Sequence, residues 1–117
     1  MVTLSSRRYV PDKGDIVWMQ FSPQAGHEQA GSRPAIIISP KAYNRKTGLA
    51  LACPITSKVK GYPFEVKLPK GLGISGVVLA DQIKNVDWVA RSAQFVCKAP
   101  SGVIEQVLFK IYVLLDF

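Results

Sequence analysis

Histidine, cysteine and long apolar segments are almost missing from this 117-residue sequence. A membrane-spanning helix needs about 20 consecutive, mostly apolar residues. No segment approaches that length, and the N-terminus lacks the apolar core of a signal peptide. The two cysteines, Cys53 and Cys97, form no C-x-x-C pair, and one histidine is too few for the usual zinc spacings. We therefore predict a cytoplasmic protein with both thiols free and buried, and with neither a metal nor a cofactor.

Acidic residues are scarce as well. Eight Asp and Glu residues stand against fifteen Lys and Arg residues, which gives a net charge of +7. From Gln29 to Phe64 there is no acidic residue at all, and the cations in that stretch are Arg33, Lys41, Arg45, Lys46, Lys58 and Lys60. Such a one-signed stretch predicts a polyanionic partner, of which nucleic acid is the commonest kind. An acidic protein segment and a merely solvated basic surface are the alternatives.

The pattern of apolar residues predicts one α+β domain over residues 1–117. Short β-branched segments bounded by Gly and Pro predict strands at 15–21, 35–39, 49–54, 64–68 and 77–80, with one or two more within 88–98. Residues 43–48 predict a turn or a short helix. The fold expected from many short strands and one late helix is a small antiparallel barrel.

Both ends of the chain carry their own signals. Val103, Val107 and Ile111 recur at helical spacing, which predicts a C-terminal helix with Ser101 as its cap and Glu105 in its first turn. Residues 1–12 are polar, and we expect a loose arm there. Trp18 and Trp88 are expected in the core.

One short loop collects three chemically useful side chains. Residues 26–34 contain His27, Glu28 and Arg33 and run directly into the apolar segment 35–38. In RNA the 2′-hydroxyl can attack the neighbouring phosphorus, so a protein need only move protons and stabilise the charge on the phosphorane. A carboxylate or imidazole suits the proton transfers, and an arginine suits the phosphoryl oxygens. Metal-independent RNA cleavage is therefore one hypothesis. A Glu28–Arg33 surface pair beside a solvated His27 is the structural alternative.

Candidates outside this loop also have two interpretations. Asp81 follows the apolar run 77–80 and either lies in a turn or faces the same cleft. The hydroxyl of Thr56 either caps a turn or binds a phosphate. Apart from Phe64, the aromatic residues of the acid-free stretch are Tyr43 and Tyr62. These two tyrosines either stack on bases or complete a core.

Three ordered blocks of the sequence resemble the MazF/PemK (Kid) family of bacterial toxins. Residues 26–34, GHEQAGSRP, resemble its GxEQxGxRP signature. Residues 54–57, PITS, and 60–66, KGYPFEV, are similar to its second block. Residues 76–82, GVVLADQ, are similar to its third block, so the resemblance covers nearly the whole chain.

The resemblance implies a small SH3-like, CcdB/PemK-like barrel with a C-terminal helix that works as a homodimer. It implies a toxin that cuts single-stranded mRNA at specific sequences without a metal, leaving 2′,3′-cyclic phosphate and 5′-hydroxyl ends and so inhibiting translation and growth. It also implies a cognate antitoxin whose acidic tail occupies the RNA groove.

Residue roles follow from the same resemblance. Arg33 matches the family's essential arginine and Thr56 the threonine that assists it, while Glu28, His27 and Asp81 match positions linked to cleavage or proton transfer. Leu79 stands where the Kid branch has an arginine, so that branch's full mechanism is not implied. The expected RNA contacts are Lys58, Lys60, Tyr62, Arg45, Lys46 and Gln82. The alternative functions are a CcdB-like gyrase poison and a non-catalytic RNA-binding barrel.

Overall fold

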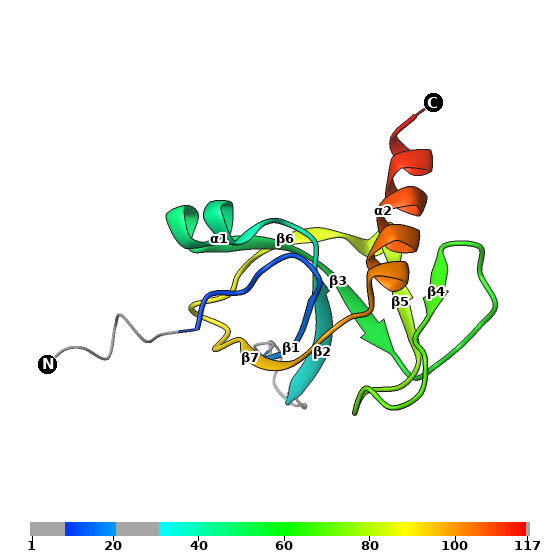
Figure 1. Ribbon diagram of the computed structural model, residues 1–117, viewed down its shortest axis with the longest axis horizontal. Helices are drawn as coiled ribbons and strands as arrows, with labels where there is room; N and C mark the ends of the chain where they lie inside the picture. The colour runs from blue at the N-terminus through cyan, green and yellow to red at the C-terminus, as the bar shows by residue number, and fades with distance from the viewer. Residues whose placement is uncertain (1–8, 21–30, 117) are drawn as a thin grey trace, which may run out of the picture.

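The computed structural model describes residues 9–20 and 31–116 (Figure 1). The elements in chain order are β1 (Asp15–Gln20), β2 (Ser32–Ile37), α1 (Lys41–Thr47), β3 (Leu49–Thr56), β4 (Glu65–Lys67), β5 (Val77–Leu79), the 3-10 turn η2 (Ala80–Gln82), β6 (Lys84–Asp87), β7 (Gln94–Lys98) and α2 (Ser101–Leu115). These confirm the predicted α+β class and the C-terminal helix.

The strands form one antiparallel, barrel-like sheet that is not closed. Its order is β4-β5-β3-β2-β1-β7, with β6 paired to β3 off this path. Strand β3 is long enough to serve three neighbours: its first half pairs with β6, its middle with β2 and its end with β5. The final residue of β3, Thr56, therefore lies where the β4–β5 pair joins the rest of the sheet.

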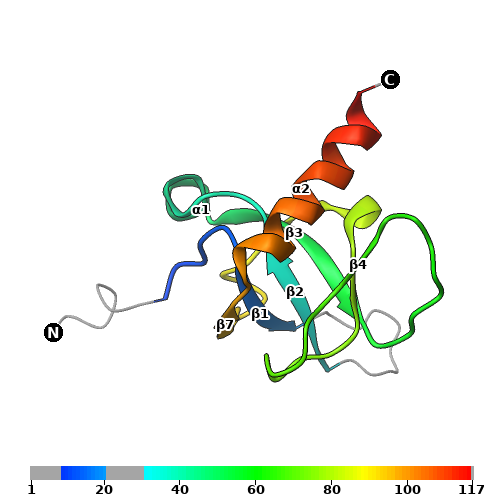
Figure 2. The same cartoon turned by 45° about the vertical axis from the view of Figure 1, so that its right-hand side comes forward.

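Both faces of the central strands are buried. Alternate side chains of a strand point to opposite faces, so Ile36 joins a core cluster beneath α2 while Ile37 joins a second cluster with Trp88. This confirms that the apolar segment 35–39 is covered on both sides. Helix α2 lies over the sheet, and its C-terminal end extends beyond it (Figure 2). Val103, Val107 and Ile111 are its buried residues, as the spacing predicted.

Several local predictions were wrong. Pro100, not Ser101, occupies the cap position of α2, no side chain caps it, and no acidic residue lies in the first turn. Strand β6 was missed because only Val86 of its four residues is buried, which leaves no apolar alternation to detect. Trp88 is core, but Trp18 is only partly buried and faces a cavity.

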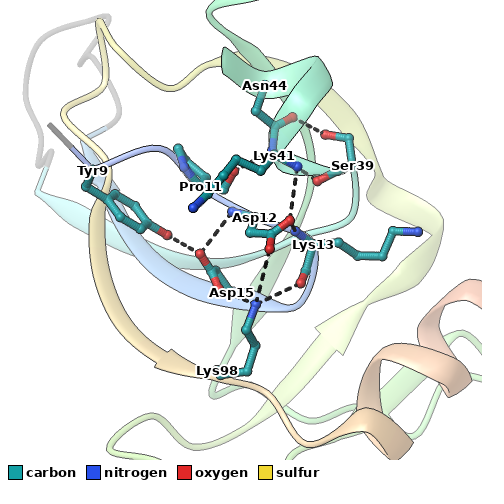
Figure 3. A network of polar contacts seen from close by, with 9 residues as sticks. All are labelled: Tyr9, Pro11, Asp12, Lys13, Asp15, Ser39, Lys41, Asn44 and Lys98. Atoms are coloured by element: carbon teal, nitrogen blue, oxygen red, sulfur yellow. Dashed lines mark hydrogen bonds and ion pairs between the residues drawn. The ribbon is translucent and has the colours of Figure 1, made fainter. Parts of the chain in front are cut away.

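Residues 9–12 are packed, in contrast to the loose arm predicted for 1–12, while residues 1–8 lie outside the described part (Figure 3). The Tyr9 hydroxyl donates to Asp15 Oδ2 at 2.5 Å, and the Asp12 amide donates to the same oxygen at 2.9 Å. Lys98 Nζ lies 2.7 Å from Asp15 Oδ1, so the buried Asp15 carboxylate has a charged partner. A carboxylate that is buried needs such partners, and they fix the chain here.

A buried asparagine ties α1 to the same segment. Asn44 Nδ2 donates to the carbonyls of Pro11 at 2.8 Å and Ser39 at 3.0 Å, and Asn44 Oδ1 accepts from the Ser39 hydroxyl at 2.6 Å. Its backbone carbonyl accepts from the Trp88 indole at 3.0 Å. Because every polar atom of this side chain has a partner, its burial is tolerated and positions the helix.

Candidate functional site

Arg33 is held in a strand rather than in a loop. It is the second residue of β2, and its backbone pairs with Met19 of β1, while the next residue, Pro34, pairs with Trp18. The side chain is exposed. The predicted strand therefore begins three residues earlier than expected, and the placement of Arg33 in the loop before it was wrong. His27 and Glu28, its predicted neighbours, lie within residues 21–30, outside the described residues.

Thr56 ends β3 and begins the turn that follows. Its Oγ1 accepts a hydrogen bond from the Lys58 amide at 3.1 Å, which fixes the hydroxyl and bends the chain. The hydroxyl proton remains available to an external acceptor such as a phosphoryl oxygen. Thr56 caps the turn through its hydroxyl oxygen, and its hydroxyl proton can at the same time serve a phosphate, so the two interpretations from the sequence do not exclude each other.

Three cavities adjoin at Thr56, and we call them together the Thr56 groove. The first measures about 640 Å³ and shares Arg33, Pro34, Ile55 and Thr56 with the second, of about 330 Å³. The third, of about 210 Å³, continues from Thr56 toward the basic turn at 58–63. The groove therefore brings Arg33 and Thr56 together although they are far apart in the sequence.

The basic turn is braced from two sides. The carboxylate of Glu65 accepts from the amides of Lys60 at 3.0 Å and Gly61 at 2.9 Å, so its charge is directed at the backbone. Lys110 of α2 donates to the Pro63 carbonyl at 2.5 Å. Lys60 Nζ lies 5.8 Å from the centre of the Tyr62 ring, within cation–π range. The turn thus presents its cations and an exposed aromatic ring from a fixed backbone.

Asp81 and Gln82 reach the groove from η2. Both are exposed and line the third cavity with Lys58, Lys60 and Tyr62. Below them, the Cys53 thiol points at the Ala80 carbonyl at 3.9 Å. Burial, with a smaller contribution from the Asp81 charge, raises the pKa of Cys53 to about 12, so this thiol stays neutral.

Other predicted residues lie elsewhere. Arg45 and Lys46 form the last turn of α1 and line none of the three cavities. Figure 1 shows α1 and β4 at opposite ends of the sheet. Tyr43, on the same helix, accepts a hydrogen bond from the Asn85 amide at 3.1 Å instead of facing the groove.

Lys84 and Trp18 are among the groove residues that the sequence did not single out. Lys84 lines the second cavity with Arg33, and Trp18 lines the first. Lys84 lies beyond the acid-free stretch that drew attention to the other lysines, although it follows Asp81 and Gln82 closely. Trp18 sits in an apolar strand, where nothing in the pattern distinguishes a groove wall from a core residue.

Two features are absent from the described ranges, 9–20 and 31–116. No three of their His, Cys, Asp and Glu side chains gather as a metal site would require. None of their helices is long and apolar enough to span a membrane.

Comparisons with known proteins agree with this geometry. A family profile described as "PemK-like, MazF-like toxin of type II toxin-antitoxin system" matches residues 12–115. Endoribonuclease toxin MazF of Escherichia coli K12 is 56% identical over 86 residues, covering 74% of this chain and 77% of the relative. Endoribonuclease PemK of Escherichia coli is 35% identical over 117 residues, covering 96% of this chain and 87% of the relative.

Solved structures match over almost the whole length. The MazE-MazF complex (Form-II) from Deinococcus radiodurans contains a chain that is 55% identical with a TM-score of 0.90, covering 94% of this chain and 99% of that one. A mycobacterial endoribonuclease bound to its cognate antitoxin has a TM-score of 0.74 at 18% identity, which supports the fold alone. The chain therefore belongs to the PemK-like, MazF-like family of toxins of type II toxin–antitoxin systems, whose relatives compared above are named endoribonucleases.

Proposed function

We propose that this chain is a cytoplasmic toxin that cleaves single-stranded mRNA at specific sequences, using the RNA's own 2′-hydroxyl as the nucleophile. The observation that carries the proposal is the Thr56 groove, where Arg33 and Thr56 line the same two cavities. Lys84 lines the second of these cavities, and Lys58 and Lys60 line the third. Such a groove offers positive charge along a backbone path and a guanidinium where a phosphate would sit.

The chemistry needs no activated water. The 2′-oxygen attacks the adjacent phosphorus while its proton passes to a base, and the bond to the 5′-oxygen breaks as that oxygen gains a proton. Arg33 stabilises the negative charge on the phosphorane and is the candidate donor of the proton to the 5′-oxygen, while Thr56 orients a phosphoryl oxygen. The products are a 2′,3′-cyclic phosphate and a 5′-hydroxyl.

Three carboxylate or imidazole groups are proposed for the proton transfers. Glu28 is the first choice as base and His27 the alternative, on the basis of the family resemblance. A carboxylate has a reference pKa of about 4.3, so Glu28 needs burial to act efficiently. Asp81 lines the third cavity of the groove and is the third candidate for a proton-transfer group.

The partners proposed are RNA, an antitoxin and a second copy of the chain. Solved relatives include MazE-MazF complexes, which supports an antitoxin here as well. An acidic antitoxin tail suits the Thr56 groove for the same reason that RNA does, because both are extended polyanions. Occupation of the groove by that tail would block cleavage.

A cleavage assay tests the proposal. The purified protein is incubated with a mixed single-stranded RNA in EDTA, and the new ends are sequenced and analysed chemically. We expect discrete cuts with cyclic phosphate ends from the parent, and a loss of about 100-fold or more from Arg33→Ala, the size found for removing a charge-stabilising donor. Arg45→Ala is the matched control, since Arg45 is exposed but lines no part of the groove.

The other outcomes point to the alternative functions. RNA binding without cuts would indicate a non-catalytic RNA-binding barrel. If the protein neither binds nor cuts the RNA, the result would favour a toxin that acts on a protein. Full cleavage by Arg33→Ala would remove Arg33 from the mechanism.

A further inference from the structure

We propose that the first cavity of the Thr56 groove is a nucleobase-binding subsite, with Trp18 and Ile74 as its apolar walls. The inference rests on the proposed ribonuclease function and adds to it which surface reads the RNA sequence. Arg33 and Thr56 line both this cavity and the second one. A base seated here therefore belongs to a nucleotide next to the phosphate that Arg33 contacts.

The lining of this cavity suits a planar heterocycle. Its apolar part comes from β1, β3 and the loop between β4 and β5: Trp18, Ile55 and Ile74. Its polar part includes the cations Arg33 and Lys58 and the hydroxyls of Ser32, Ser57 and Ser75. No carboxylate lines it within the described residues. A nucleobase has apolar faces and polar edges, so this combination can hold the ring and contact its edges.

The cavity is large enough for this ligand. Its volume of about 640 Å³ falls inside the range of about 300–1,000 Å³ typical of small-molecule sites. Every nucleotide carries a planar ring that can stack on an indole, whereas an acidic peptide offers an apolar group only at positions where it also carries an aliphatic or aromatic side chain. These apolar walls favour the base of a nucleotide.

The wall formed by Ile74 is held in place by the fold. Leu68 N donates to the Gly76 carbonyl at 3.0 Å and closes the loop at its base. Gly76 has a φ of +119°, and a Cβ added there would lie 2.1 Å from the Thr56 carbonyl. Only glycine allows this approach, so the loop is fixed directly against the residue at the centre of the groove. Leu72 and Ile74 then pack on the core cluster beneath α2.

A pair of alanine substitutions in this loop separates recognition from packing. Ile74 and Leu72 both pack on the same core, but only Ile74 lines the cavity. The nucleotide preference around each cut is measured with a randomised single-stranded RNA library. We expect Ile74→Ala to weaken the preference at one position beside the cut by about 10-fold, as loss of pocket contacts typically does. Leu72→Ala should keep the parent's preference at every position.

The fluorescence of the unsubstituted protein supplies a readout that depends on no variant. Trp18 and Trp88 are the only tryptophans, and Trp88 is 6% exposed, so a change on RNA binding reports Trp18. The probe is an RNA oligonucleotide with a 2′-deoxy nucleotide at the cut, which binds without being cleaved. We expect quenching that disappears when the base beside the cut is replaced by an abasic site.

The outcomes separate this inference from the proposed function. If the parent cuts RNA but Ile74→Ala keeps its sequence preference and binding leaves Trp18 emission unchanged, the base subsite is wrong and the ribonuclease stands. If the parent neither binds nor cuts RNA, both are overturned.

Discussion

At the scale of single residues, burial separates the two cysteines. Cys53 is fully buried on β3, and its pKa is raised to about 12 by burial and by Asp81. Cys97 on β7 is half-buried, and burial followed by the charge of Asp15 raises its pKa as well. Both thiols are free. A reagent must reach the sulfur before it can react, so the half-buried Cys97 is favoured over the fully buried Cys53.

The prediction for these thiols is an order of modification. With an aromatic disulfide reagent at about pH 8, Cys97 should react first, and Cys53 should react only when the protein unfolds. Mass spectrometry of the partly labelled native protein identifies the site, and urea provides the unfolded control. Equal labelling of Cys53 in the native protein would contradict its burial.

Asp12 gives a prediction about acid stability. Burial alone would raise the pKa of Asp12, but the amides of Lys41 at 3.0 Å and Lys13 at 2.8 Å, with the Lys98 charge, lower it overall. A carboxyl whose pKa is lower in the folded state contributes stability above its unfolded value of about 3.9, and this is lost as the pH falls through the lowered pKa.

The test compares the free energy of unfolding at pH 7 and at about pH 3. We expect Asp12→Asn to lose less stability between the two conditions than the parent, because the neutral amide no longer titrates. Asp116→Asn, at the exposed end of α2, is the control and should follow the parent. An unchanged acid sensitivity in Asp12→Asn would show that the Asp12 contacts do not contribute.

At the scale of elements, the groove depends on how the β4–β5 loop meets the end of β3. Thr56 pairs with Val77 across β3 and β5. The neighbouring Gly76 lies so near the Thr56 backbone that an added Cβ would stand 2.1 Å from the Thr56 carbonyl oxygen. One glycine therefore sets the position of a groove wall and of Thr56 at once.

Gly76→Ala should accordingly damage both stability and cleavage. We expect the free energy of unfolding to fall by about 3 kcal/mol or more, from backbone strain combined with the clash. Gly71→Ala is the matched control: its φ is also positive, +91°, but an added Cβ would meet nothing within 4 Å. Its cost should be only about 1 kcal/mol, the strain alone. Urea unfolding and the RNA assay measure both variants; equal losses would contradict the contact with Thr56.

At the scale of the whole molecule, a net charge of +7 attracts any polyanion, but its arrangement decides affinity. Lys58 and Lys60 line the groove, while Arg45 and Lys46 lie on α1 and line none of its cavities. The two pairs carry the same charge, so replacing one or the other changes the net charge equally.

Salt dependence of RNA binding distinguishes the two pairs. For single strands, each neutralised phosphate contributes about 0.7 to the slope of log affinity against log salt. We expect the double variant Lys58→Gln and Lys60→Gln to lower the slope by about 1.4, and Arg45→Gln with Lys46→Gln to leave it unchanged. The uncleavable RNA is the ligand. If both double variants lower the slope by the same amount, the net charge of the protein, rather than the position of the lysines in the groove, governs RNA binding.

The sequence by itself determined the fold class, the C-terminal helix and the family. Local periodicity predicts helix and strand, and the three ordered motif blocks are a property of residue order. It also singled out Arg33, Thr56 and Asp81, whose residue types carry recognisable chemistry. It failed where local pattern is weak: the polar strand β6 and the packed residues 9–12, whose partners are distant in the chain.

Only the tertiary structure decided which of the basic and aromatic residues share a surface. Arg45 and Lys60 are both cations of the acid-free stretch and both expected RNA contacts, yet only Lys60 lines the groove. Pairing of β3 with both β2 and β5 likewise brings Arg33 to Thr56. The fold also places Trp18 in the wall of the first cavity and Lys84 in the lining of the second, which the sequence did not indicate. The physical reason is that strand pairing and the Gly76 contact join segments far apart in sequence, and no local pattern records where such segments meet.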